Sequence, residues 1–106
     1  MATLDMNLMH AVRTIRATVP HMKGRDHASI VIVSSISAWK PGPRAQYGAA
    51  KAAEIFLESS LAWDLAADHI RVNTICPGSI YFSTSSWAYY ERDDPKGYVR
   101  FLKNEL

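Results

Sequence analysis

Two short runs rich in β-branched residues constrain the fold of this chain more than any other sequence feature. They cover residues 29–33 and residues 70–75. Each run is as long as a strand, and the continuous β-branched run at 29–33 is typical of a strand buried on both faces of a parallel sheet. The residues between the runs have room for a loop and one long helix. The two strands are therefore predicted to be parallel and joined by a right-handed crossover.

Helical periodicity surrounds the first run. Residues 3–22 carry an apolar stripe at helical spacing, formed by Leu4, Leu8, Ala11, Val12, Ile15 and Val19. Residues 46–65 carry a second stripe, formed by Ala53, Phe56, Leu57, Ser60, Leu61 and Leu65. The predicted order is helix–strand–helix–strand–helix, with the last helix beginning near residue 95. This order indicates an α/β chain that forms part of a doubly wound parallel sheet.

The character of the sequence changes after the second run. Residues 83–86 are small and polar, and three aromatic residues follow them: Trp87, Tyr89 and Tyr90. Two interpretations stay open here, a lid over a ligand lined by aromatic rings and a loop that covers part of the core. The final helix is predicted to have an apolar side formed by Val99, Phe101 and Leu102.

Composition narrows the classes of function. The 106 residues form at most one domain, 1–106, and the net charge of +2 with mixed signs predicts no nucleic-acid or anionic membrane partner. No apolar run reaches the length of a membrane span, and no signal peptide or metal site is predicted. The single cysteine, Cys76, fits a reducing compartment, so we expect a cytoplasmic protein. Cys76 follows the second strand and is expected to be buried as an apolar residue.

Tyr47 and Lys51 carry the strongest chemical signal. They are four residues apart near the start of the second predicted helix, so their side chains share one face of it. An ammonium and a helix N-terminus beside a phenol favour the phenolate and lower the pKa of the phenol. Such a tyrosine exchanges protons near neutral pH, as general acid–base catalysis requires. Taken alone, the pair is a weak signal and is more typical of a surface tyrosine that packs over a lysine stem.

The order of four motifs resembles the classical branch of the short-chain dehydrogenase/reductase family. The motifs are Asn7 in an Asn-Leu context, Val-Ser-Ser-Ile-Ser at 33–37, Tyr-Gly-Ala-Ala-Lys at 47–51, and the strand and turn at 70–80 that contain Asn-Thr-Ile-Cys-Pro-Gly-Ser-Ile. The resemblance extends from residue 4 to about residue 80. The extended, sugar-nucleotide-modifying branch shares the Tyr-Lys pair, but the short turn after residue 75 fits the classical branch better.

The resemblance implies a Rossmann-like fold, with three αβα layers in the complete protein. It also implies an oxidoreductase that interconverts a small-molecule alcohol and a carbonyl with NAD or NADP. Tyr47 would be the acid–base for the substrate oxygen, and Lys51 would assist it and hold the nicotinamide ribose, so that both would contact the cofactor. Asn7 would hold a water in a proton relay. Three residues of the turn would lie against the nicotinamide: Pro77, Gly78 and Ile80.

Family members commonly form subunit interfaces through the helices that correspond to residues 6–22 and 49–65. The resemblance therefore implies a homodimer or homotetramer.

A serine that hydrogen-bonds the substrate oxygen is also implied, and two serines compete for this role. Ser35 is the second of its pair, as in the family, but lies twelve residues before Tyr47, whereas Ser34 has the commoner spacing of thirteen. Adjacent residues at a strand end point to opposite sides, so only one can face the substrate. Ser35 is the prediction, because loops change length more readily than strand ends change register. Phe82 departs from the family pattern, since many members have a cofactor-binding threonine there.

The Gly-rich turn that cradles the cofactor pyrophosphate in this fold does not occur in the sequence. The residue that would select between the two cofactors and the family's Asn-Asn-Ala-Gly strand are missing as well. We therefore expect the chain to be the central and C-terminal-side part of a longer enzyme, inactive on its own. The alternative is a non-enzymatic fragment or interaction module that keeps the helix-mediated association surface of the fold.

Overall fold

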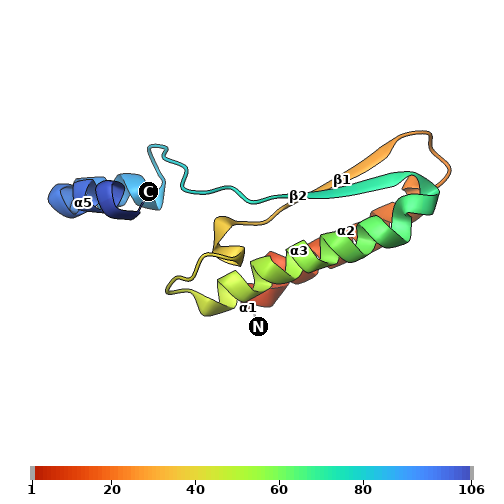
Figure 1. Cartoon of the computed structure of the whole chain (residues 1–106), viewed down its shortest axis with the longest axis horizontal. Helices are drawn as coiled ribbons and strands as arrows, with labels where there is room; N and C mark the ends of the chain where they lie inside the picture. The colour runs from red at the N-terminus through yellow and green to blue at the C-terminus, as the bar shows by residue number, and fades with distance from the viewer. Residues whose placement is uncertain (1, 106) are drawn as a thin grey trace.

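The computed structural model describes residues 2–105, and its elements follow the predicted order with one additional helix after the second strand (Figure 1). A continuous helical segment comes first, formed by α1 (Ala2–Leu4), the π-helix η1 (Asp5–Met9) and α2 (His10–Met22). The strand–helix–strand unit follows, formed by β1 (Ala28–Val33), the 3-10 turn η2 (Ile36–Ala38), α3 (Ala45–Leu65), the 3-10 turn η3 (Ala66–Asp68) and β2 (Ile70–Ile75). Two helices come last, α4 (Ser86–Asp93) and α5 (Pro95–Glu105).

The two strands are parallel, which confirms the predicted crossover unit. Ala28 lies opposite Ile70 and Val33 lies opposite Ile75. Pairing continues past the strand ends, because Ser34 N donates to Ile75 O at 2.8 Å and Ile36 N donates to Pro77 O at 3.0 Å. The segments that follow β1 and β2 therefore remain paired as far as Ile36 and Pro77.

The core lies between one face of the sheet and the helices α2 and α3, which lie on the same side of the strands (Figure 1). Its buried members are Ile15, Ile32, Leu65, Ile70 and Val72. Alternate strand residues face the helices because successive side chains of a strand point to opposite faces.

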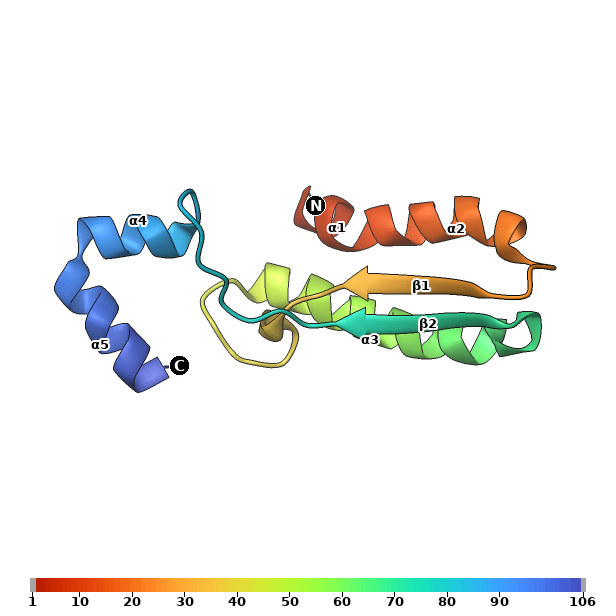
Figure 2. The ribbon, with the colours of Figure 1, turned by 90° about the horizontal axis from the view of Figure 1, so that it is seen from above.

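The other face of the sheet is uncovered within the described part of the chain, so the prediction that β1 is buried on both faces is wrong here. Val31 and Val33 are 57% and 54% exposed. Cys76, which was expected to be buried, is also exposed. Both exposures have the same physical reason, which is that no described element covers these residues. Among residues 2–105, helices pack on one face of the sheet only, and the chain extends away from the sheet after β2 (Figure 2).

The apolar stripe of α3 is only partly buried. Leu57 and Leu61 pack against the core and Leu65 is buried, as predicted. Phe56, predicted to belong to the same stripe, is exposed and lies on the outer side of the helix with Trp63. Helical periodicity therefore predicted these three leucines correctly, but it also included Phe56, which lies outside the buried face.

The segment after β2 contains a helix, α4, that the sequence did not predict. Ser85 caps it, accepting a hydrogen bond from Ala88 N at 3.2 Å. Asp94 precedes α5 and accepts a hydrogen bond from Gly97 N at 3.1 Å, with Pro95 at the first helical position.

The aromatic residues of this segment hold α4 and α5 together. The Trp87 and Phe101 rings stack with centroids 4.9 Å apart, and the Tyr90 and Tyr98 rings meet edge to face at 5.6 Å. Tyr98 is buried, whereas Val99 and Leu102, predicted to form the apolar side, are exposed. Figure 2 shows the helix pair apart from the sheet, beyond an extended connector. Trp87 and Tyr90 thus form the small core of a helical hairpin, a third outcome beside the lid and the covering loop.

Among residues 2–105, no helix combines the length and apolarity needed to cross a membrane.

His69 generates a prediction about stability. It ends the helical segment of α3 and η3 in a left-handed conformation, with φ 58° and ψ 32°. This conformation costs a residue with a side chain about 1–2 kcal/mol, whereas glycine adopts it freely. We predict that His69→Gly raises the free energy of unfolding by about 1 kcal/mol, measured by urea denaturation.

The matched control is His69→Ala, which removes the imidazole but keeps Cβ and should not stabilise the protein. An equal gain in both variants would show that the imidazole, rather than the backbone, is unfavourable.

Candidate active site

The candidate site lies where β1 ends against the first turns of α3. Lys51 Nζ donates to Val33 O at 3.1 Å, and Ser34 Oγ donates to Lys51 O at 2.8 Å. Both side chains are buried, with Lys51 8% exposed and Ser34 5% exposed. These two hydrogen bonds connect residues far apart in sequence and attach the helix to the strand end.

Tyr47 lies one helical turn before Lys51 and is half-buried. Lys51 Nζ is 5.7 Å from the centre of the Tyr47 ring, so the four-residue spacing brings the two groups together as predicted. Arg44 Cζ lies 4.3 Å from the same ring centre, within the range of a cation–π contact. Arg44 was not predicted from the sequence, because it precedes the helix and helical spacing therefore does not relate it to Tyr47.

Glu54 is the second residue that sequence reasoning missed. It is 1% exposed, and its Oε1 lies 3.1 Å from Lys51 Nζ. The contact is an ion pair without hydrogen-bond geometry, since Oε1 has no hydrogen-bond partner among the described residues. The available signal was the three-residue spacing from Lys51, which puts Glu54 on the same face of α3.

The two candidate serines have different surroundings. Ser34 is buried, and its hydroxyl is occupied by the carbonyl of Lys51. Ser35 is half-buried and accepts a hydrogen bond from Ser37 N at 3.1 Å at the start of η2. A hydroxyl that accepts in this way keeps its hydrogen for donation to another group.

Asn7 lies in the π-helix η1, which packs against α3. Its Nδ2 donates to Thr3 O at 3.0 Å within the same helical segment. Irregular turns of this kind are frequent at functional sites. The structure therefore puts Asn7 on an element that contacts α3, with its amide bonded within its own helix.

The residues of the predicted nicotinamide contact lie along the segment that leaves β2. Pro77 is next to the Ser35 turn, because Pro77 O accepts the hydrogen bond from Ile36 N. Gly78 is exposed, and Ile80 is 59% exposed in the extended connector. The structure thus brings Ser35, Lys51 and Pro77 to one end of the sheet, while Ile80 lies farther along the connector.

Tyr81 lies in the connector that follows β2, and its hydroxyl contacts α4. Its Oη donates to Glu91 Oε1 at 2.9 Å, and this hydrogen bond raises the pKa of Tyr81. General acid–base work at neutral pH requires the opposite direction. Tyr81 therefore attaches the connector to α4, and its raised pKa disfavours a role as acid–base at neutral pH.

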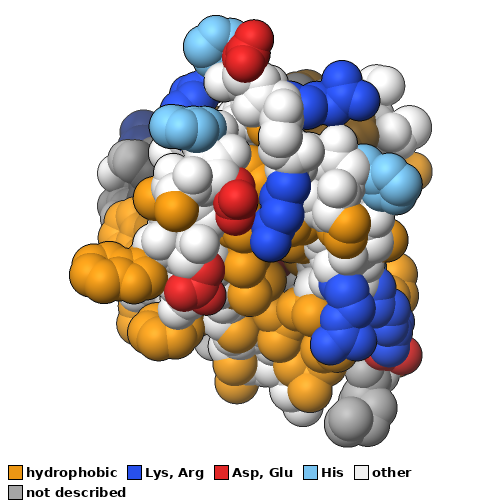
Figure 3. Space-filling view, turned by 90° about the vertical axis from the view of Figure 1, so that its right-hand side faces the viewer, with side chains coloured by type: hydrophobic (Ala, Val, Ile, Leu, Met, Phe, Trp, Pro, Cys, Tyr) orange, Lys and Arg blue, Asp and Glu red, His pale blue; other side chains and the backbone are white. Residues whose placement is uncertain are grey.

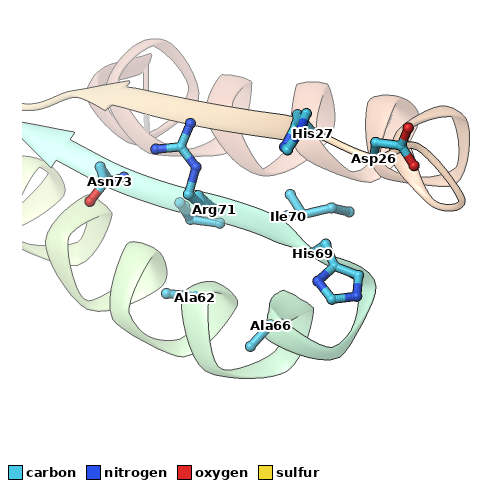
Figure 4. A pocket seen from close by; sticks show the side chains of 9 residues that line it. Asp26, His27, Ala62, Ala66, His69, Ile70, Arg71 and Asn73 are labelled. Carbon is cyan, nitrogen blue, oxygen red and sulfur yellow. The ribbon is translucent and has the colours of Figure 1, made fainter.

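A hollow of about 690 Å³ lies at the other end of β2, between that strand and the end of α3 (Figure 4). Its polar lining comes from Asp26, His27, His69, Arg71 and Asn73. Figure 3 views the molecule from this side and shows histidine, acidic and basic side chains around exposed hydrophobic ones. Because β2 begins here and the Lys51 site lies beside the carboxyl end of β1, this hollow is separate from the candidate site.

Comparison with known proteins identifies relatives of both the sequence and the fold. A family model described as short chain dehydrogenase matches residues 1–94. Dehydrogenase/reductase SDR family member 4 from Homo sapiens is 40% identical over 95 residues, which cover 87% of this chain and 34% of the relative. The chain therefore spans about a third of the length of this curated relative.

Two solved structures share the fold. The L-sorbose reductase of Gluconobacter frateurii, complexed with NADPH and L-sorbose, matches with a TM-score of 0.77 and 31% identity over 95% of this chain and 40% of that one. The carveol dehydrogenase of Mycobacterium avium, in complex with NAD, matches with a TM-score of 0.71 and 32% identity over 87% of this chain and 34% of that one. These matches confirm the predicted fold class, part of a Rossmann-like α/β fold.

Gly48 generates a prediction about the geometry of the site. A Cβ atom there would lie 2.8 Å from Ser37 O, so glycine allows α3 to approach the turn that follows Ser35. We predict that Gly48→Ala lowers the free energy of unfolding by about 1 kcal/mol, because a clash of about 1–3 kcal/mol exceeds the gain in helix propensity. Chemical denaturation measures the change.

Gly42→Ala is the control, since a Cβ at Gly42 meets nothing within 4 Å. Equal stability of Gly48→Ala and the parent protein would show that the turn moves away without cost.

Proposed function

This chain belongs to the short-chain dehydrogenase family, and we propose that the complete protein is an oxidoreductase that interconverts a hydroxyl and a carbonyl with NAD or NADP. The observation that carries the proposal is the attachment of Lys51 to the end of β1 with the Tyr47 ring 5.7 Å from its ammonium. Ligands of doubly wound sheets bind at the carboxyl ends of the strands. The nicotinamide dinucleotides bound by the two solved relatives support the choice of cofactor.

In this proposal Tyr47 is the catalytic acid–base. During reduction its phenol gives a proton to the substrate oxygen, and during oxidation its phenolate removes the proton of the substrate hydroxyl. Ser35 donates a hydrogen bond to the same oxygen and orients it. A bound nicotinamide dinucleotide supplies or accepts the hydride. Asn7 holds a water that connects the site with solvent.

The donor groups present fit the nicotinamide end of such a cofactor. Lys51 has an ammonium with three hydrogens, one of which is used by Val33 O, so donors remain for a ribose hydroxyl. The ammonium also lies 5.7 Å from the centre of the Tyr47 ring, beside the proposed acid–base. Three residues would form the surface against the nicotinamide ring: Pro77, Gly78 and Ile80. The exposed side chain of Ile80 offers apolar area for this contact.

The outer side of α3 supports association of the complete protein as a homodimer or homotetramer. Phe56 and Trp63 are 74% and 84% exposed and lie seven residues apart on one helix face. Large apolar side chains that are exposed together indicate an interaction surface. The same face supports the second candidate function, an interaction module without catalysis. The single cysteine allows no disulfide within this chain, which supports a reducing location such as the cytoplasm.

Substitution of Tyr47 tests the proposal and separates the two candidate functions. A set of ketones, aldehydes and secondary alcohols is first assayed with the complete protein and each nicotinamide cofactor, followed by nicotinamide absorbance. We predict that Tyr47→Phe lowers turnover by about 10²–10⁴-fold, because the phenol is the proton donor, with cofactor affinity nearly unchanged. Fluorescence titration measures that affinity.

Tyr81→Phe is the control and should keep its activity. Retention of activity within about tenfold in Tyr47→Phe, a loss of only ~1.4 kcal/mol, would refute the role of the phenol.

The two serines give a second prediction. Ser35→Ala should lower turnover strongly, because its hydroxyl serves the substrate, and should also lower the free energy of unfolding by about 0.5–2 kcal/mol through the lost cap of η2. Ser34→Ala should lower the free energy of unfolding by about 1 kcal/mol through the lost bond to Lys51 O, with the smaller effect on turnover. Steady-state kinetics and urea denaturation measure both quantities. The reverse ranking in turnover would assign the substrate contact to Ser34.

A further inference from the structure

We infer that Glu54 is a positioning residue for Lys51, a buried carboxylate that keeps the ammonium charged and fixed at the end of β1. This inference rests on the proposed function, in which Lys51 needs its positive charge. It assigns the neighbouring acid a role in maintaining that charge.

The geometry of the two side chains supports the assignment. Glu54 Oε1 lies 3.1 Å from Lys51 Nζ, and the side chains are only 1% and 10% exposed. Lys51 Nζ also donates to Val33 O at 3.1 Å, so the ammonium lies between a strand carbonyl and a carboxylate. Two of its contacts are therefore protein oxygens that favour the charged form.

Burial makes this partner necessary. Removal from water disfavours the charged form of a lysine, and an opposite charge nearby favours it. The same applies to the carboxylate, since a buried charge is tolerated when it is paired. Because Oε1 has no hydrogen-bond donor among the described residues, the ammonium of Lys51 is the group that compensates this oxygen.

No other described group replaces Glu54 at this position. The segment η1, which packs against α3, carries one ionisable side chain, Asp5, and that carboxylate pairs with Arg13 at 2.9 Å. The turn η2 and the segment α1 carry none, and Asp68 of η3 pairs with Lys23 at 3.7 Å. The strand β2 carries Arg71, which is exposed on the opposite face of the sheet. Among the side chains described, Glu54 is therefore the anion that acts on Lys51.

The spacing along α3 extends the effect toward Tyr47. Tyr47, Lys51 and Glu54 are related by four and three residues, so phenol, ammonium and carboxylate follow one another on one helix face. A carboxylate at the end of this row holds Nζ on the helix side, within 5.7 Å of the phenol ring centre. Glu54 thereby acts through Lys51 and has no contact of its own with a substrate.

The test is a pH titration of Lys51 itself in the complete enzyme. Lysines are labelled with ¹³C at Cε, the Lys51 signal is assigned with the Lys51→Arg variant, and its chemical shift is followed by NMR. We expect Glu54→Gln to lower the midpoint of this titration by about one pH unit or more, because loss of the carboxylate makes release of the ammonium proton easier. An unchanged midpoint would overturn the inference.

Glu58→Gln is the matched control on the same helix, since the Glu58 carboxylate contacts the Ser59 hydroxyl at 3.1 Å. It should leave the Lys51 midpoint unchanged. A shift as large as that of Glu54→Gln would show a general effect of charge on α3 and would also overturn the inference.

Kinetics provide a second readout. In Glu54→Gln the activity on the alkaline side should be lost at lower pH than in the parent, and Glu54→Asp should recover part of the difference. The NMR titration needs no turnover, so failure of hydride transfer with a shifted midpoint would refute only the proposed function. An active enzyme with an unshifted midpoint would refute only the role of Glu54.

If Glu54→Gln fails to fold, the double variant Glu54→Gln/Lys51→Met decides the question. Recovery of folding would support the pairing, because the uncompensated ammonium is then the cause of instability. If the double variant also fails to fold, the inference is overturned, because loss of Glu54 would then destabilise the protein even without the Lys51 charge.

Discussion

The attachment of Lys51 to the end of β1 is the interaction on which the candidate site depends. Lys51 Nζ bonds Val33 O, and Ser34 Oγ bonds Lys51 O, so a side chain from each element reaches the backbone of the other. Buried hydrogen bonds of this kind contribute about 1 kcal/mol each and cost more when one partner is left unpaired. The start of α3 is thereby fixed, and with it the position of the Tyr47 ring. Close approach of the helix at Gly48 completes the arrangement around the Ser35 turn.

The sheet is covered by helices on one face only, and this explains which apolar side chains are exposed. The helices α2 and α3 cover one face of a two-stranded sheet, while Val31 and Val33 face outward on the other. Two strands alone give a marginally stable sheet, and unpaired strand edges tend to pair with other chains. Since the chain spans about a third of a curated relative, we propose that further strands and helices of the complete protein cover these surfaces. The hairpin of α4 and α5 differs, because its aromatic rings supply a small core of their own.

Local patterns in the sequence determined the elements and the proximity of the main chemical groups. The strands predicted at 29–33 and 70–75 agree with Ala28–Val33 and Ile70–Ile75, because β-branched residues strongly favour extended backbone. The contact between Tyr47 and Lys51 followed from helix geometry alone, since residues four apart always share a face. The helix α4 escaped prediction because its signal is a single capping serine, Ser85, within a run of small polar residues.

Tertiary structure decided which of these side chains are buried and which partners they meet. Periodicity identifies the residues that share a face, but coverage of that face depends on elements distant in sequence. Phe56 and Cys76 are exposed for this reason, since no described element packs over them. Ser34 and Glu54 are buried for the same reason, since α3 docks on the end of β1. The sequence by itself therefore determined the strands, the helices other than α4 and the Tyr47–Lys51 pair. Only the docking of α3 on β1 buried the Lys51–Glu54 pair, because removal of these charges from water depends on packing in three dimensions.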